Sequence, residues 1–277
     1  MQVLNRITDV KAFKAQNPWP PVEGTFEGHV FFLPLNPSEK VLAVYKDLTR
    51  KLNEMRADEF GKAQIKACHL ALDFRGKGFV RVMQSARYFV AHSMDQAIAE
   101  LHKEADMYTE LIAEAYRTGQ LSLEDDGQLQ VVREKLETLA SSHGVPVSDE
   151  ETVNYNKKYF EFHIRLSRKD ETDISPVTEE EISELQTISH EFTQRFGVPV
   201  PLSYNKTNEH QRFLNVRFRN TGSHNARVFV QQIVDAINSS ASFKWVKTIS
   251  EYVPYDSYSL MDSGWIDDLE PVAVAAN

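Results

Sequence analysis

Strict alternation of apolar and polar residues marks the clearest strands of the chain. Every second residue of Tyr159–Leu166 is Phe, Ile or Leu, and Gln211–Asn220 alternates in a similar way. Successive side chains of a strand point to opposite faces, so each segment predicts one apolar face and one polar face. We expect the apolar faces to lie under helices and the polar faces to be open.

Apolar residues at helical spacing predict the helices that cover these faces. After Ser38, a suitable N-cap, apolar residues recur every three or four positions. Ser93 opens a second helix in the same way. Thr178–Glu181 has the form of a capping box, and Gly197 stops the helix that follows it. A fourth helix is predicted over Asn225–Asn238.

The order of these elements predicts the fold class. The other β-rich segments are Phe26–Leu35, Ile65–Phe74, Phe79–Val90, Gln128–Thr138, Val200–Thr207 and Phe243–Pro254. With the helices between them, the order β-α-β-β-α-β occurs twice, which is the order of the ferredoxin-like unit. The sequence therefore predicts an α+β protein of two tandem ferredoxin-like (βαββαβ) halves with antiparallel sheets.

Corresponding residues suggest that the two halves are an internal duplication. Phe26-Glu27-Gly28-His29 stands where Phe160-Glu161-Phe162-His163 stands in the second half. The run from Leu129 to Lys135 corresponds to the run from Phe243 to Ile249. This correspondence favours a strand for Gln128–Thr138, a segment whose own pattern fits a helix or a strand.

Four parts of the chain follow from this pattern. An N-terminal arm (1–25) contains Asn17-Pro18-Trp19-Pro20-Pro21, which cannot continue a helix. The first half (26–150) and the second half (151–254) follow. In the C-terminal part (255–277), tyrosines, acids and Trp265 predict a tail that docks on the body.

Composition narrows the classes of function. The chain has 277 residues, one cysteine and a net charge of −9. One cysteine excludes a disulfide framework, and no apolar run is long enough to span a bilayer. We therefore expect a cytoplasmic protein without a membrane partner. The acidic balance argues against nucleic acid, since neutralising phosphates requires a basic surface.

The polar faces of the predicted strands carry the candidate ligand-binding residues. Three arginines, a histidine and neighbouring polar groups share one sheet face: Glu161, His163, Arg165, Asn215, Arg217 and Arg219, joined by Tyr204 and Lys206 from the next strand. Guanidinium groups bind phosphate and carboxylate bidentately, so this face suits a small anionic, phosphate-bearing ligand. The plainer interpretation is a solvated face on which Glu161 pairs with an arginine.

The first half offers a weaker parallel. His29, His69 and Arg81 fall on the polar sides of its predicted strands. If the halves associate through their sheet faces, His29 and His163 line one cleft and are the candidates for acid–base catalysis. A single cysteine and the absence of a paired-histidine helix motif give no metal site, and no cofactor is predicted.

Several short motifs resemble the signatures of a group of bacterial proteins that has no assigned activity. They are Tyr159-Phe160-Glu161-x-His163, Arg212-Phe213, and Tyr255-Asp256-Ser257 with Asp262-x-Gly264-Trp265-Ile266. The resemblance covers mainly residues 157–267. It implies a shared fold and transfers no activity.

Three hypotheses of function follow from the sequence. The first is binding, with or without turnover, of the anionic ligand. The second is a non-catalytic interaction or structural protein that uses its sheet faces to bind a partner or a second copy in a homodimer. The third is single-stranded RNA binding, with Tyr159, Phe213 and Tyr204 stacking on bases. Whether the protein is an enzyme stays open at this point.

Overall fold

The structure is a computed structural model and describes residues 7, 9–61, 63–73, 79–155, 157–173, 175–205 and 211–258. The strands are β1 (Gly24–Leu33), β2 (Lys66–Asp73), β3 (Phe79–Ala91), β4 (Gln130–Leu139), β5 (Tyr159–Arg168), β6 (Leu202–Asn205), β7 (Arg212–Arg219) and β8 (Phe243–Asp256). The helices are α1 (Val10–Gln16), α2 (Glu39–Met55), α3 (Ala57–Phe60), α4 (Met94–Arg117), α5 (Leu123–Asp126), α6 (Asp149–Thr152), the 3-10 helix Val153–Tyr155, α7 (Glu179–Phe196) and α8 (Ser223–Ser239). In this part of the chain, no helix has the length and apolar character needed to cross a bilayer.

Local capping explains where the main helices begin and end. The hydroxyls of Ser38 and Ser93 accept hydrogen bonds from backbone N–H groups three residues on, at 3.2 Å each. Thr178 and Glu181 form the predicted capping box on α7. Gly197 ends α7 with φ of 69°, in the left-handed region that favours glycine.

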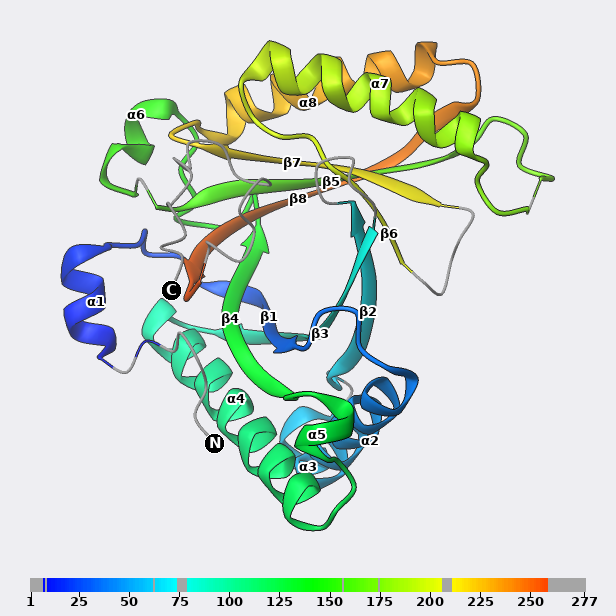
Figure 1. The fold of residues 1–277 in the computed structure, drawn as a ribbon. Coiled ribbons are helices and arrows are strands. Elements are labelled where there is room, and N and C mark those ends of the chain that lie inside the picture. Colours follow the sequence, from blue (N-terminus) through cyan, green and yellow to red (C-terminus); the bar gives the residue numbers. More distant parts are fainter. Residues whose placement is uncertain are drawn as a thin grey trace, which may run out of the picture.

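The eight strands form one closed barrel in the order β1-β3-β2-β6-β7-β5-β8-β4. Every pairing is antiparallel. Two pairings join the halves of the chain: β2 with β6, where Ala71 lies opposite Tyr204, and β4 with β8, where Leu136 lies opposite Tyr255. In Figure 1, α7 and α8 cover one side of the barrel, and α2, α4 and α5 lie at the opposite side.

The predicted fold class of two tandem ferredoxin-like halves with separate sheets is therefore wrong. β4, β1, β3 and β2 are neighbours in one half, and β6, β7, β5 and β8 in the other, but neither sheet stays open. A free strand edge exposes unpaired N–H and C=O groups, and edge-to-edge pairing across β2–β6 and β4–β8 satisfies them. The result is one barrel to which both halves contribute.

Barrel closure decides what the two faces of each strand contact. Phe160, Phe162 and Ile164 are at most 1% exposed, in the core beneath the helices of the second half. The polar faces of the same strands point to the interior of the barrel. The open sheet face on which the interaction and RNA hypotheses depended is therefore closed, since Tyr159 is buried and Tyr204 and Phe213 line the interior.

The two ends of the described chain pack against each other. The Phe13 ring of α1 lies 6.3 Å from the Trp19 ring and 6.2 Å from the Tyr255 ring. β8 continues to Asp256, beyond the predicted boundary at Pro254. Trp265, the predicted anchor of the tail, lies outside the described residues.

Candidate functional site

The barrel interior contains a cavity of about 340 Å³. This volume lies at the lower end of the range for small-molecule sites, about 300–1,000 Å³. Two other hollows measure about 470 and 530 Å³. Among their many lining residues, only Arg87 in the first and Arg168 in the second are both buried and charged. Six buried ionisable side chains line the interior cavity: His29, Lys135, Glu137, Glu161, Arg217 and Glu251.

The cavity has two chemically different walls. The neighbouring strands β5, β8, β4 and β1 contribute all four of its glutamates, its lysine and both of its histidines. The neighbouring strands β2, β6 and β7 contribute the apolar and aromatic side chains of Leu70, Leu72, Tyr204 and Phe213, beside the uncharged polar Ser203 and Asn215. Phe31 and Ile249 are the apolar residues among the charged strands. We call these the charged wall and the apolar wall. Arg217 of β7 is the one charged residue of the apolar side.

Glu161 is the centre of the ion pairs on the charged wall. Its carboxylate oxygens accept hydrogen bonds from Lys135 Nζ and Arg217 Nη2, each at 2.6 Å. Burial alone would raise the pKa of Glu161, but Arg217 and Lys135 outweigh burial and hold it at about 2. Lys135 Nζ also lies 2.5 Å from Glu137 Oε1. Burial would lower the pKa of Lys135, but these two carboxylates raise it well above its ordinary value.

His29 connects the charged wall to a polar network outside the barrel. Its Nδ1 lies 2.9 Å from the Ser85 carbonyl oxygen, and its Nε2 lies 3.0 Å from Glu137 Oε2. A carbonyl oxygen only accepts, so Nδ1 donates and Nε2 faces the carboxylate. Burial would lower the pKa of His29, but Glu137 outweighs burial and raises it.

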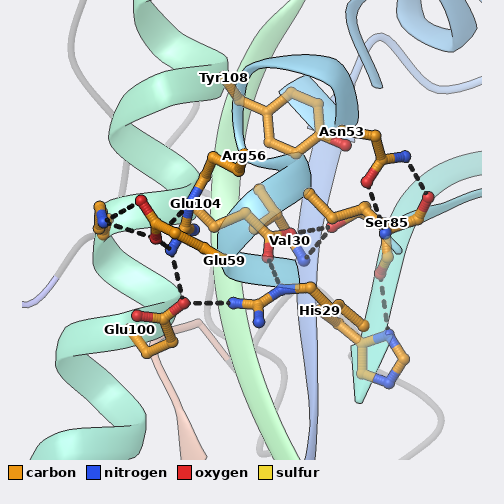
Figure 2. A network of polar contacts seen from close by, with 12 residues as sticks. His29, Val30, Asn53, Arg56, Glu59, Ser85, Glu100, Glu104 and Tyr108 are labelled. Carbon is orange, nitrogen blue, oxygen red and sulfur yellow. Dashed lines mark hydrogen bonds and ion pairs between the residues drawn. The ribbon is translucent and has the colours of Figure 1, made fainter. Parts of the chain in front are cut away.

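The network behind His29 runs through the barrel wall to α4, as Figure 2 shows. The Ser85 hydroxyl donates to Glu104 at 3.0 Å, and Arg87 Nε donates to the other oxygen of Glu104 at 2.8 Å. Arg87 and Arg56 both donate to Glu100 Oε1 at 2.9 Å. Burial raises the pKa of Glu104 in spite of Arg87. These bonds hold Ser85 in place, and the carbonyl oxygen of Ser85 orients the His29 ring.

His163 and Glu251 form a second acid–base pair in the cavity. His163 Nδ1 lies 2.6 Å from Asn215 Oδ1, while the amide nitrogen of Asn215 donates to the Pro201 carbonyl and the Ser203 hydroxyl. His163 Nε2 therefore faces Glu251, at 3.5 Å from its carboxylate. Burial and then the nearby carboxylates, Glu137 first, raise the pKa of Glu251 to about 10. Glu251 is thus a protonated carboxyl group at neutral pH.

Strand register places glutamates directly opposite one another at two points of the charged wall. Glu27 of β1 lies opposite Glu137 of β4, and Glu161 of β5 lies opposite Glu251 of β8. A histidine follows two residues after Glu27 and after Glu161 on the same strand face. One carboxylate oxygen each of Glu27 and Glu137 and one ring nitrogen of His29 all lie within 4.8 Å of one another.

The structure brings together six of the residues predicted from sequence. His29, Glu161, His163, Tyr204, Asn215 and Arg217 all line the cavity. Both candidate catalytic histidines are therefore in one site, on the charged wall. Their face is the inside of a closed barrel rather than an open or solvated sheet, because the two sheets pair at both edges.

The other predicted residues do not line the cavity. Arg165 lines a separate hollow with Arg168 and Lys244, and Arg219 lies at the end of β7, opposite Tyr159. His69 lies between Leu70 and Cys68 on β2, with its side chain on the face opposite to that of Leu70. Arg81 donates to the Pro37 carbonyl at 3.0 Å, near the start of α2. Lys206 lies outside the described residues.

Sequence reasoning missed four of the seven ionisable residues of the charged wall: Glu27, Lys135, Glu137 and Glu251. The signal for Glu27 was present, since Glu-x-His occurs at the matching positions 27–29 and 161–163. Extending the correspondence of Leu129–Lys135 with Phe243–Ile249 by two residues would have paired Glu137 with Glu251. Lys135 gave no signal, because its role depends on a contact with Glu161 across the barrel interior.

Comparisons with known proteins give distant likenesses. No protein-family model and no curated protein matches the chain. Similar solved structures include a heme-binding protein from Thermus thermophilus, 12% identical over 89% of this chain and 97% of that chain, with a TM-score of 0.27. Another is an aldoxime dehydratase in complex with butyraldoxime, 9% identical over 86% and 87%, with a TM-score of 0.31. A dye-decolorizing protein from V. cholerae is 9% identical over 88% and 97%, with a TM-score of 0.25. At such identities and TM-scores these likenesses carry no argument about what this chain binds.

Proposed function

We propose that this protein binds a small, uncharged amphipathic molecule in the barrel cavity. The observation that carries the proposal is the division of the cavity into a charged wall and an apolar wall. A molecule with a hydrocarbon or aromatic part would place it against Leu70, Leu72 and Phe213. Its polar end would then meet the charged wall. Cavities with mostly apolar contacts and a few polar groups that fix orientation are typical of small-molecule sites.

The ion pairs of the charged wall support an uncharged polar end. Lys135 and Arg217 already bind the Glu161 carboxylate, and Lys135 also binds Glu137. A bound phosphate would have to draw these cations away from buried carboxylates, which would then lose their partners at a large cost. The phosphate-bearing ligand predicted from the arginines stays a prediction, and this geometry gives it less support.

Glu251 and His163 are the groups that would bind the polar end. Glu251 as a protonated carboxyl donates a hydrogen bond, and His163 presents Nε2 beside it. A hydroxyl group can therefore accept from Glu251 and donate to His163 Nε2, and a carbonyl group can accept from Glu251. If the protein turns its ligand over, this pair is where a proton would be transferred.

A ligand screen with a cavity-filling variant tests the proposal. Neutral amphipathic compounds and phosphate-bearing compounds of similar size are compared by thermal shift and calorimetry. A compound at one hundred times its dissociation constant stabilises the protein by about 2.7 kcal/mol. We expect neutral compounds to bind wild type and Leu139→Trp, whose site is 55% exposed on the surface. The same compounds should fail to bind Leu70→Trp, in which the indole occupies the cavity.

Two results would overturn the proposal. One is binding of neutral compounds that Leu70→Trp leaves unchanged, which would place their site elsewhere. The other is a screen in which only phosphate-bearing compounds bind and Arg217→Lys weakens them. That second result would restore the anionic ligand predicted from the sequence.

A further inference from the structure

Two carboxylates stand side by side on the charged wall where β1 meets β4. Glu27 and Glu137 lie directly opposite each other in the antiparallel register. Like charges at such positions repel and destabilise a sheet. Glu137 Oε1 is taken by Lys135, while Glu137 Oε2 points to the side of His29. Glu137 Oε2 is therefore the oxygen on the side of Glu27 and His29.

The orientation of His29 calls for a positive centre between these groups. Nδ1 donates to the Ser85 carbonyl oxygen, so Nε2 is the atom that lies 3.0 Å from Glu137 Oε2 and 4.0 Å from Glu27 Oε1. Two lone pairs at 3.0 Å repel, so either a proton or a cation must lie between Nε2 and Glu137. An imidazole that donates its other N–H to a backbone carbonyl is the usual arrangement of metal-binding histidines.

A buried carboxyl without a hydrogen bond lines the same cavity. Glu251 is 6% exposed and lines the cavity. Among the described residues its carboxyl makes one ion pair, with His163 at 3.5 Å, and no hydrogen bond. Buried polar groups nearly always have partners, so this carboxyl is short of one.

The cavity lining carries a net negative charge that a cation would offset. It holds four glutamates, one lysine and one arginine, together with two histidines. With neutral histidines and a protonated Glu251, the three other carboxylates exceed the two fixed cations by one charge.

We propose that Glu27, His29 and Glu137 bind a divalent first-row transition-metal ion, such as Zn²⁺ or Mn²⁺, at the charged wall. One imidazole with two carboxylates suits such ions better than Ca²⁺ or Mg²⁺, which prefer oxygen ligands alone. The Ser85 carbonyl and its network to Glu104 orient the imidazole from outside the barrel. The site does not depend on the proposed organic ligand, because its three donors belong to the protein.

Direct metal titration of the chelator-treated full chain, without a histidine tag, tests the site. Calorimetry with Zn²⁺ and electron paramagnetic resonance with Mn²⁺ measure binding in the absence of organic compounds. We expect one ion per chain in wild type, and at least tenfold weaker binding in Glu27→Gln and His29→Gln. Loss of an outer-shell partner alone costs about 10–100-fold in metal affinity, and a direct ligand should cost no less. Mg²⁺ is expected to bind more weakly than Zn²⁺.

Matched controls separate this site from adventitious binding. His143→Gln and Glu110→Gln replace an exposed histidine and an exposed glutamate and should leave the affinity unchanged. Glu27 is the least buried of the three donors, at 14% side-chain exposure, so Glu27→Gln keeps the test valid if His29→Gln does not fold. No saturable binding to wild type, or equal affinity in folded Glu27→Gln, would overturn the proposal. Either result would assign the position between His29 and Glu137 to a proton.

Discussion

At the scale of single residues, the barrel interior holds its glutamates in different protonation states. Glu161 has two cationic partners and a pKa of about 2. Glu251 lies opposite it in the strand register but has a pKa of about 10, because burial and the nearby carboxylates disfavour its charge. Two glutamates on neighbouring strands thus have different roles. Glu161 is an ionised carboxylate paired with cations, and Glu251 is a protonated carboxyl that can donate a hydrogen bond.

The raised pKa of Glu251 predicts how stability depends on pH. The unfolded chain releases this proton near the ordinary pKa of 4.5, whereas the folded protein keeps it up to about pH 10. Folding therefore takes up a proton, and this contribution to stability is complete below pH 4.5 and declines as pH rises toward 10. The decline is at most about 1.4 kcal/mol per pH unit. We expect Glu251→Gln to remove it, and to be more stable than wild type at pH 8 by urea unfolding.

The control for this prediction is Glu110→Gln, at an exposed position on α4. It should change neither the stability at pH 8 nor the slope against pH. A Glu251→Gln variant with the wild-type slope between pH 5 and 9 would show that Glu251 is ionised in the folded protein.

At the scale of elements, caps position the helices that cover the barrel. Thr178 accepts from the Glu181 N–H at 3.3 Å, and Glu181 accepts from the Thr178 N–H at 2.7 Å. Glu181 also binds Arg168 at the end of β5, so this cap ties α7 to the barrel wall. Its pKa falls to about 2, mainly through Arg168.

Thr178→Ala should destabilise the protein by about 1 kcal/mol, since an N-cap hydroxyl is lost. Thr187→Ala on the exposed face of the same helix is the matched control, where the hydroxyl only bonds the Ser183 carbonyl. Because alanine has the higher helix propensity, this control should be neutral or slightly stabilising. Equal effects of the two substitutions in urea unfolding would contradict the role assigned to the cap.

Local signals are also why the elements could be predicted from the sequence. The caps at Ser38, Ser93 and Thr178 and the stop at Gly197 are where the pattern placed them. The ambiguous run Gln128–Thr138 is a strand, β4. Alternation also divided β5 and β7 correctly into apolar and polar faces. Each of these features depends on residues close together in the chain.

At the scale of the whole molecule, barrel closure could not be predicted in this way. It depends on the β2–β6 and β4–β8 pairings, which join strands more than one hundred residues apart. Because closure was missed, the polar face of β5 was expected to be open, and a phosphate-binding surface followed from its arginines. Within the barrel, Arg217 instead belongs to the ion pairs of Glu161.

Closure also predicts that the two halves unfold together. Leu185 on α7 is fully buried in the second half, and Leu185→Ala should cost about 2–5 kcal/mol. Trp19 is 7% exposed and lines a hollow with Met94 at the start of α4, while Lys158 Nζ of the second half lies 5.7 Å from its ring. Its fluorescence therefore reports how the N-terminal arm packs on the body when Trp245 and Trp265 are replaced by Phe. We expect Leu185→Ala to shift the urea midpoint of Trp19 fluorescence and of far-ultraviolet circular dichroism by the same amount. A two-step dichroism curve in which the Trp19 midpoint does not move would contradict this expectation. It would mean that the first half folds alone, because the β2–β6 and β4–β8 pairings add too little stability to couple the halves.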